Sequence, residues 1–213
     1  MPATSGPSTH TVPPGLPVLD AGAHRDARSG SCVMEYVSVL AGERFSDRPR
    51  CTHPAVAALA WQVNDAVSHA VRQELALRAP ALVGAGRGTD APVRPVVLET
   101  VLAAGLALDP ENRFFHRLRR KLDRDAERDA ASGRAARSDG GGGRLATLLH
   151  VGPVNHACAH LMVAARAAGL GPAERDRLAV RLLDDCLAAV GAAGRDADAV
   201  PVAPADEPVA ARG

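Results

Sequence analysis

Apolar residues recur along most of the chain at the three- and four-residue spacing that is typical of amphipathic α-helices. In residues 32–41 such residues form one face of a predicted helix, and they are Val33, Tyr36, Val37 and Leu40. Ser31 stands where this helix would be capped, and Gly42 stands where it would end. We therefore expect a first helix with one buried face, followed by a polar loop.

The second apolar segment begins behind Thr52 or His53, either of which can cap a helix. Pro54 follows in the first turn, where the missing backbone N–H costs nothing. Residues 55–63 are apolar on almost every side. This pattern predicts a buried helix at the centre of the fold.

Further helices are expected along the rest of the chain, over residues 68–79, 93–108, 109–131, 144–168 and 172–190. Ser68 and Asp109 are the expected caps of the first and third of these helices. Pro153 lies inside the range 144–168 and predicts a break or a kink there. Together with the first two segments, these ranges predict an all-α fold, a helical bundle of about six or seven helices.

Composition supports the helical prediction, because 46% of the residues are hydrophobic but only 2% are aromatic. Strand-rich sandwiches and barrels draw on β-branched and aromatic residues, whereas an alanine-rich chain suits closely packed helices. The shortage of aromatic residues also excludes a stacking platform for single-stranded nucleic acid.

The two ends of the chain lack a helical or strand period. Residues 1–28 and 194–213 are rich in Pro, Ala, Gly, Ser and Asp, so we expect them to form disordered tails. Residues 29–193 are expected to form a single helical domain. Within it, the Gly-rich residues 138–143 are expected to form a flexible linker.

The charge balance indicates no particular class of partner, since the formal net charge is +1. It provides no global attraction to nucleic acid or to an anionic membrane surface. No apolar run is long enough to span a membrane, and the first 28 residues do not fit a secretory signal. Four cysteines are too few and too scattered for a disulfide framework. We therefore expect a cytoplasmic protein that binds no membrane.

The densest group of reactive side chains lies in residues 32–53 and consists of Cys32, Glu35, Cys51 and His53. Two thiolates, a carboxylate and an imidazole can ligate zinc, provided that the intervening loop folds back along the first helix. The alternative gives these residues structural roles. The cysteines then fill the core, Glu35 pairs with Arg44 or Arg48, and His53 caps the second helix.

A series of short motifs runs through residues 32–84. It consists of Cys32-Val-Met-Glu35, Ala41-Gly42-Glu43, Ser46-Asp47-Arg48-Pro49, Cys51, Pro54, Asn64-Asp65 and Pro80-Ala-Leu-Val-Gly84. This pattern resembles an uncharacterised family of small bacterial proteins, with Arg44 standing where that family has proline. The resemblance implies that residues 32–65 form one structural unit. It implies no activity, cofactor or substrate.

A second candidate metal site is the pair His156 and His160, which stand at i and i+4 on one predicted helical face. This spacing lets one helix offer two imidazoles to one metal ion. Ala157 stands where a zinc peptidase motif requires glutamate, so that motif is absent. The alternative is a pair of histidines at the surface or the edge of the core.

Arginines form a stripe along the predicted 109–131 helix, at Arg113, Arg117, Arg120, Arg124 and Arg128. Such a stripe can follow a phosphate backbone. However, residues 113–128 hold seven basic and three acidic residues, which is a modest excess. We expect a solvated, salt-bridged face and no nucleic-acid partner.

These features favour a small helical interaction or regulatory protein without catalytic activity, which binds an unidentified protein partner. Residues 32–65 are expected to form its core hairpin and the surface for that partner. The alternative is a metal- or thiol-dependent protein that uses the cluster of Cys32, Glu35, Cys51 and His53, with zinc as the cofactor.

Overall fold

The computed structural model describes residues 17–89, 91–132 and 144–198. Its elements, in chain order, are α1 (Val33–Leu40), α2 (Pro54–Ala66), α3 (His69–Glu74), the 3-10 helix η1 (Leu75–Arg78), α4 (Ala79–Leu82), α5 (Val93–Leu108), α6 (Arg113–Ala131), α7 (Arg144–Ala167) and α8 (Pro172–Asp198). The only extended pairing in the described residues is an isolated bridge between Leu19 and Ser31. The predicted all-α helical bundle is confirmed.

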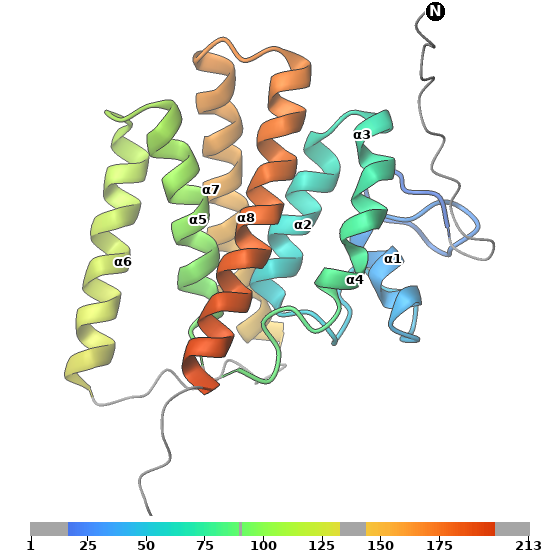
Figure 1. Cartoon of the computed structure of the whole chain (residues 1–213), viewed down its shortest axis with the longest axis horizontal. Coiled ribbons are helices and arrows are strands. Elements are labelled where there is room, and N and C mark those ends of the chain that lie inside the picture. The colour runs from blue at the N-terminus through green and yellow to red at the C-terminus, as the bar shows by residue number, and fades with distance from the viewer. Residues whose placement is uncertain (1–16, 90, 133–143, 199–213) are drawn as a thin grey trace, which may run out of the picture.

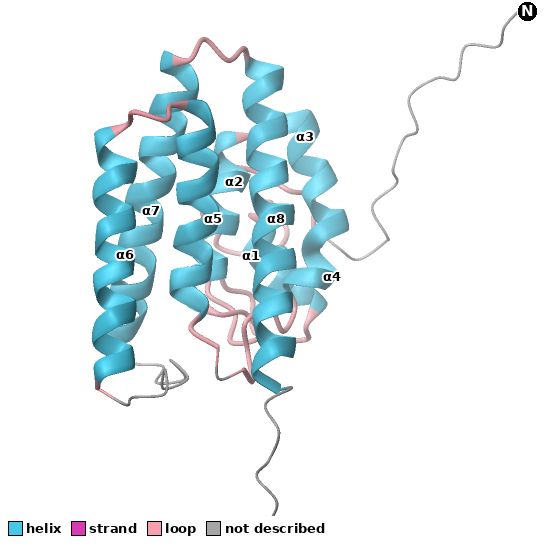
Figure 2. Ribbon diagram, turned by 60° about the vertical axis from the view of Figure 1, so that its left-hand side comes forward, coloured by secondary structure: helices cyan, strands magenta, loops and turns pink. Residues whose placement is uncertain are grey.

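Helices α2, α5, α7 and α8 form the centre of the bundle, and their axes run side by side (Figure 1). Helices α7 and α8 each pack against both α2 and α5. Helix α6 packs against α5 and forms one edge of the molecule. In Figure 1 helices α1, α3 and α4 form the opposite edge. In the turned view of Figure 2, α3 and α4 remain at the edge, whereas α1 is seen between α5 and α8.

Helix α2 is the buried central helix that the apolar pattern predicts. His53 caps it, and Pro54 occupies its first turn. Every residue from 55 to 60 is buried, and four of these six are alanines. Because these side chains are small, neighbouring helices can approach α2 closely on several sides.

Helix α1 differs from its prediction in its cap and in its burial. Cys32 is the cap residue, so the predicted Ser31 cap is wrong. All residues from 33 to 38 are buried, whereas Leu40, expected in the core, is 41% exposed. The helix is buried on more than one face, because α2 packs against one side of it and α4 against another. Helices α1 and α2 themselves therefore expose few side chains. The expectation that residues 32–65 form a surface for a partner stays a prediction.

Helix α6 begins later than the sequence pattern predicts. Asn112 caps it by accepting a hydrogen bond from the backbone N–H of Phe114. Asp109, the predicted cap, instead forms the preceding turn and accepts a hydrogen bond from the Asn112 side chain at 3.0 Å. Both residue types cap helices well, so the tertiary contacts of this turn decide which one is used.

The ordered part of the chain begins before residue 28, where the N-terminal tail was expected to end. Leu19 is only 1% exposed. Its carbonyl oxygen accepts a hydrogen bond from Gln73 Nε2 at 2.7 Å, and its N–H donates to Gln73 Oε1 at 3.3 Å. A single buried leucine with its backbone groups paired thus fixes a segment that has no periodic pattern of its own.

Two features of the C-terminal half differ from expectation, the end of α8 and the course of α7. Helix α8 continues to Asp198, beyond the predicted tail boundary at residue 194. Helix α7 continues through Pro153 without a break. The predicted linker at residues 138–143 lies outside the described residues.

None of the helices in the described ranges is both long and apolar enough to cross a membrane.

Candidate functional site

Cys32 and Glu35 form a reciprocal cap at the start of α1. The Cys32 Sγ accepts a hydrogen bond from the Glu35 N–H at 3.4 Å, and the Glu35 Oε2 accepts one from the Cys32 N–H at 2.7 Å. The same carboxylate pairs with His24 Nδ1 at 2.9 Å. The expected pairing of Glu35 with Arg44 or Arg48 is therefore wrong. The carboxylate joins the 17–31 segment to α1.

Cys51 and His53 lie at the start of α2, close to the loop that follows α4. The His53 Nδ1 accepts a hydrogen bond from the Ala55 N–H at 3.1 Å, so its predicted capping role is confirmed. The His53 ring also meets the His150 ring edge-to-face, with centroids 5.2 Å apart. Cys51 is half-buried, and its Sγ lies 3.7 Å from the hydroxyl of Thr52. These contacts fix the side chains structurally.

The predicted zinc site gains no support from this arrangement. Among the residues whose side chains are described, no three His, Cys, Asp or Glu side chains gather so that they could hold a metal ion. Burial raises the pKa of the Cys32 thiol to about 12, with the neighbouring Glu35 charge adding to the rise. A thiol in this state is not a ready metal ligand or nucleophile. Zinc binding by Cys32, Glu35, Cys51 and His53 stays a prediction.

The histidine pair on α7 is brought together as its spacing predicts. The His156 and His160 Nε2 atoms lie 2.9 Å apart, and the two rings are nearly parallel. The ring of Phe114, from α6, stacks on His160 with a centroid distance of 3.7 Å and on His156 with 5.2 Å. Desolvation and the nearby His156 lower the pKa of His160, which favours its neutral form.

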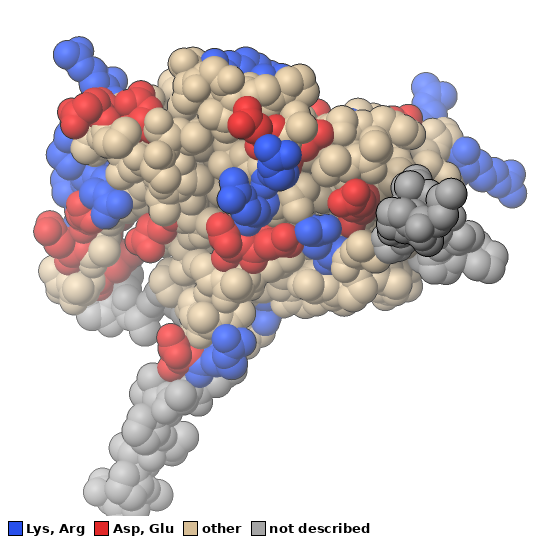
Figure 3. Space-filling model, turned by 45° about the horizontal axis from the view of Figure 1, so that its top comes forward, with Lys and Arg blue, Asp and Glu red and all other residues tan. Residues whose placement is uncertain are grey.

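The arginine stripe of α6 lies at the edge of the bundle. All five of its arginines are exposed. Within the described residues, the helix has one ion pair, between Arg128 and Asp125 at 3.6 Å. Basic and acidic side chains alternate along this edge, at the left of Figure 3. The expectation that this face binds no nucleic acid stays a prediction.

A groove between the α3–η1 segment and α8 was not anticipated from the sequence. It has a volume of about 430 Å³, and its lining residues are Val71, Glu74, Arg78, Ala173, Asp176, Arg177, Val180, Arg181 and Asp184. Those from α8 recur at three- and four-residue spacing, so they share one face of that helix. In Figure 3 charged side chains of both signs also gather on the middle of one face of the molecule.

Two polar bridges hold the walls of the groove together at its two ends. At one end Asp176 accepts hydrogen bonds from the backbone N–H and the hydroxyl of Ser68, at 3.0 and 2.6 Å. At the other end Arg78 binds Asp184 through two parallel hydrogen bonds of 2.9 and 3.0 Å. This contact raises the pKa of Arg78. The two walls are thus held at a set separation.

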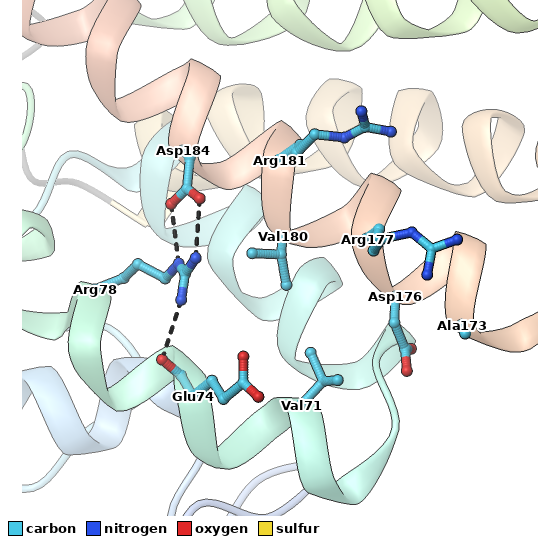
Figure 4. A pocket seen from close by; sticks show the side chains of 9 residues that line it. All are labelled: Val71, Glu74, Arg78, Ala173, Asp176, Arg177, Val180, Arg181 and Asp184. Atoms are coloured by element: carbon cyan, nitrogen blue, oxygen red, sulfur yellow. Dashed lines mark hydrogen bonds and ion pairs between the residues drawn. The ribbon is translucent and has the colours of Figure 1, made fainter. Parts of the chain in front are cut away.

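The floor of the groove between these bridges is apolar. Val71 and Val180 lie between the two helices, with the Arg78–Asp184 bridge at one end and Asp176 at the other (Figure 4). Both valines are only partly buried. The Arg177 and Arg181 side chains extend to the same side of α8 in this view. An apolar floor with charged rims is the arrangement that binding grooves have in common.

The sequence holds only a weak signal for this groove. The residues that bridge its two walls are more than 100 positions apart, with separations of 108 for Ser68–Asp176 and 106 for Arg78–Asp184. Each wall by itself has the pattern of an ordinary amphipathic helix. Only the packing of α8 beside α3 and η1 makes the two patterns one site.

Comparisons with known proteins add no assignment, because no family model, curated protein or solved structure matches the chain. The resemblance of residues 32–84 to an uncharacterised bacterial family stays a prediction. The function must therefore be argued from the geometry of the described residues.

Proposed function

We propose that this protein is a non-catalytic interaction module, and that the groove between α3–η1 and α8 receives an amphipathic helix of a partner protein. The observation that carries this proposal is the groove itself, with its apolar floor, charged rims and volume of about 430 Å³. The cytoplasmic location and the bacterial origin rest only on the sequence pattern and belong to the same proposal.

The shape of the groove favours a helical segment as the occupant. Its two walls are helical segments joined by hydrogen bonds to Asp176 and Asp184. Eight residues of α-helix separate these two positions, which corresponds to about 12 Å, or roughly two turns. Val71 and Val180 on its floor are only partly buried. A partner helix can therefore lay apolar side chains, one turn apart, over Val71 and Val180.

The charges on the rims indicate what the partner helix carries beside its apolar residues. In the described part of the chain, Arg177 and Arg181 form no ion pair, and neither does the side chain of Glu74. Arg177 and Arg181 are one turn apart on α8. We therefore expect acidic residues one turn apart on the partner, facing α8, and a basic residue facing Glu74.

A selection from a displayed library of amphipathic helical peptides tests this proposal directly. The full chain is immobilised, and enriched peptides are synthesised and titrated against it by fluorescence anisotropy. We expect enriched peptides to carry apolar residues at i and i+4 flanked by Asp or Glu. Their affinity should fall at least about tenfold on Arg177→Glu/Arg181→Glu, since two attractive charge pairs become repulsive.

Two matched control variants locate the binding surface. Arg120→Glu/Arg124→Glu makes the same charge reversal, with the same spacing, on the exposed face of α6. Val180→Asp places a charge on the groove floor, whereas Val163→Asp places one on an α7 position that is 59% exposed. Peptides that bind the α6 variant less tightly and the α8 variant unchanged contradict the proposal, and so does a selection that enriches no peptide.

A further inference from the structure

A second site lies away from the groove, where α6 packs beside α7. His156 and His160 point their Nε2 atoms toward each other at 2.9 Å. The ring centroids are 4.8 Å apart, and the ring planes differ by 10°. This centroid distance is shorter than it would be if the two nitrogens faced each other along one line. The ring axes are therefore inclined to the line between the two nitrogens. At this distance one Nε2–H donates to the other Nε2, so both nitrogens face the same small region beside the rings.

The separation of the two nitrogens suits a shared metal ion. Zinc–imidazole bonds are about 2.0–2.1 Å long, so an N–metal–N angle between a right angle and the tetrahedral angle requires nitrogens about 2.8–3.4 Å apart. The observed distance of 2.9 Å falls in this range. An ion bound by both nitrogens would take the place of the proton that one Nε2 now donates to the other.

The surroundings of the pair hold both rings in this orientation and leave the site accessible. The Phe114 ring is stacked against both imidazoles, with interplanar angles of 12° to His160 and 7° to His156. Phe114 therefore limits ring rotation from one side. His156 is exposed and His160 is partly exposed, so water can complete the coordination shell of an ion.

We propose that His156 and His160 form a two-histidine binding site for a divalent transition-metal ion of the nickel, copper and zinc group. Imidazole nitrogens suit these ions, and Cu²⁺ is expected to bind most tightly. No third His, Cys, Asp or Glu joins the pair among the residues whose side chains are described. The site is thus an open one, distinct in position and in ligand chemistry from the peptide groove.

Isothermal titration of the untagged full chain with Zn²⁺ and, separately, Cu²⁺ tests the site. We expect one ion to bind per chain. Each of His156→Gln and His160→Gln should weaken this binding about a hundredfold, because a second imidazole on the same helix face acts at high effective concentration. His116→Gln and His69→Gln remove histidines from α6 and α3 and should leave the affinity unchanged.

A spectroscopic measurement on the unsubstituted protein completes the test. Its result does not depend on whether the substituted variants fold. The electron paramagnetic resonance spectrum of the Cu²⁺ complex should show hyperfine coupling to two equivalent imidazole nitrogens. Absence of stoichiometric binding overturns the proposal, as does binding that both glutamine variants retain. Coupling to a single nitrogen also overturns it.

Discussion

Glu35 binds His24 twice, although eleven positions separate them in the chain: its Oε1 accepts the His24 backbone N–H at 2.9 Å, and its Oε2 pairs with the His24 Nδ1 at 2.9 Å. The same Oε2 accepts the Cys32 N–H at 2.7 Å. The carboxylate is only 2% exposed. A buried carboxylate with several partners therefore joins the N-terminal segment to the first helix.

Replacement of Glu35 should reveal this role. Glu35→Gln retains the shape of the side chain but turns part of it into a donor that faces other N–H groups. We expect the free energy of unfolding to fall by about 1–3 kcal/mol, as for other buried hydrogen bonds to charged groups. Urea unfolding followed by circular dichroism measures this loss. The control, Glu127→Gln on the exposed part of α6, should change stability by less than about 0.5 kcal/mol; equal stabilities for the two variants would refute the role.

The Arg78–Asp184 bridge should contribute far less to the free energy of unfolding than the hydrogen bonds of Glu35 do, although its geometry is bidentate. The Arg78 side chain is 23% exposed and that of Asp184 is 46% exposed. Solvent screens such pairs, so Asp184→Asn should cost only about 0–1 kcal/mol of unfolding free energy. The same urea titration checks this expectation. A loss above about 2 kcal/mol would show that the wall of the groove depends on this bridge for folding.

Helices with a strong local pattern could be predicted from the sequence, whereas contacts between distant segments could not. The observed range of α5, Val93–Leu108, agrees with the predicted residues 93–108 because its apolar pattern and its flanking residues are local. The 17–28 segment was missed because one leucine among polar residues carries no periodicity. Its order depends on Leu19 and Gln73, which are 54 positions apart.

Gly105 of α5 lies directly against the Phe115 ring of α6. A Cβ built on Gly105 would overlap the Phe115 ring, and Phe115 is fully buried. Alanine is a better helix former than glycine by about 1 kcal/mol, but this overlap should cost more than that gain. We therefore expect Gly105→Ala to lower the melting temperature and to loosen α6.

Gly152 provides the matched control for that substitution. It lies in α7, and a Cβ built there meets nothing within 4 Å. Gly152→Ala should thus stabilise the protein by up to about 1 kcal/mol. Thermal unfolding of the two variants should give shifts of opposite sign. Two shifts of the same sign would contradict the assignment of Gly105 as a packing residue.

The four cysteines should differ in reactivity in the folded protein. Burial raises the pKa of Cys32, Cys158 and Cys186 to about 12, so their thiols stay protonated at pH 8 and become thiolates only near pH 12. Cys51 is only half-buried. Ellman's reagent at pH 8 should therefore label at most one thiol rapidly, and that label should be absent from Cys51→Ser. Rapid labelling of two or more thiols in the native state would be inconsistent with this burial, while all four should react in urea.

The candidate sites show the same limit of sequence reasoning as the fold. The His156–His160 pair could be predicted because i and i+4 positions of one helix always lie close together. The groove could not, because Val71 and Val180 look like ordinary core residues in their own helices. Nothing local to either helix indicates that both valines stay partly exposed between two polar bridges.

Methyl-resolved NMR of the full chain, titrated with a peptide selected on it, tests the central claim most directly. The account predicts that the Val71 and Val180 methyl signals shift together on binding, and that Val163, exposed on α7, does not move. In the Arg177→Glu/Arg181→Glu variant, the same shifts of Val71 and Val180 should require at least about ten times more peptide. Shifts at Val163 with unchanged signals from Val71 and Val180 would contradict the claim that the groove between α3–η1 and α8 is the recognition site.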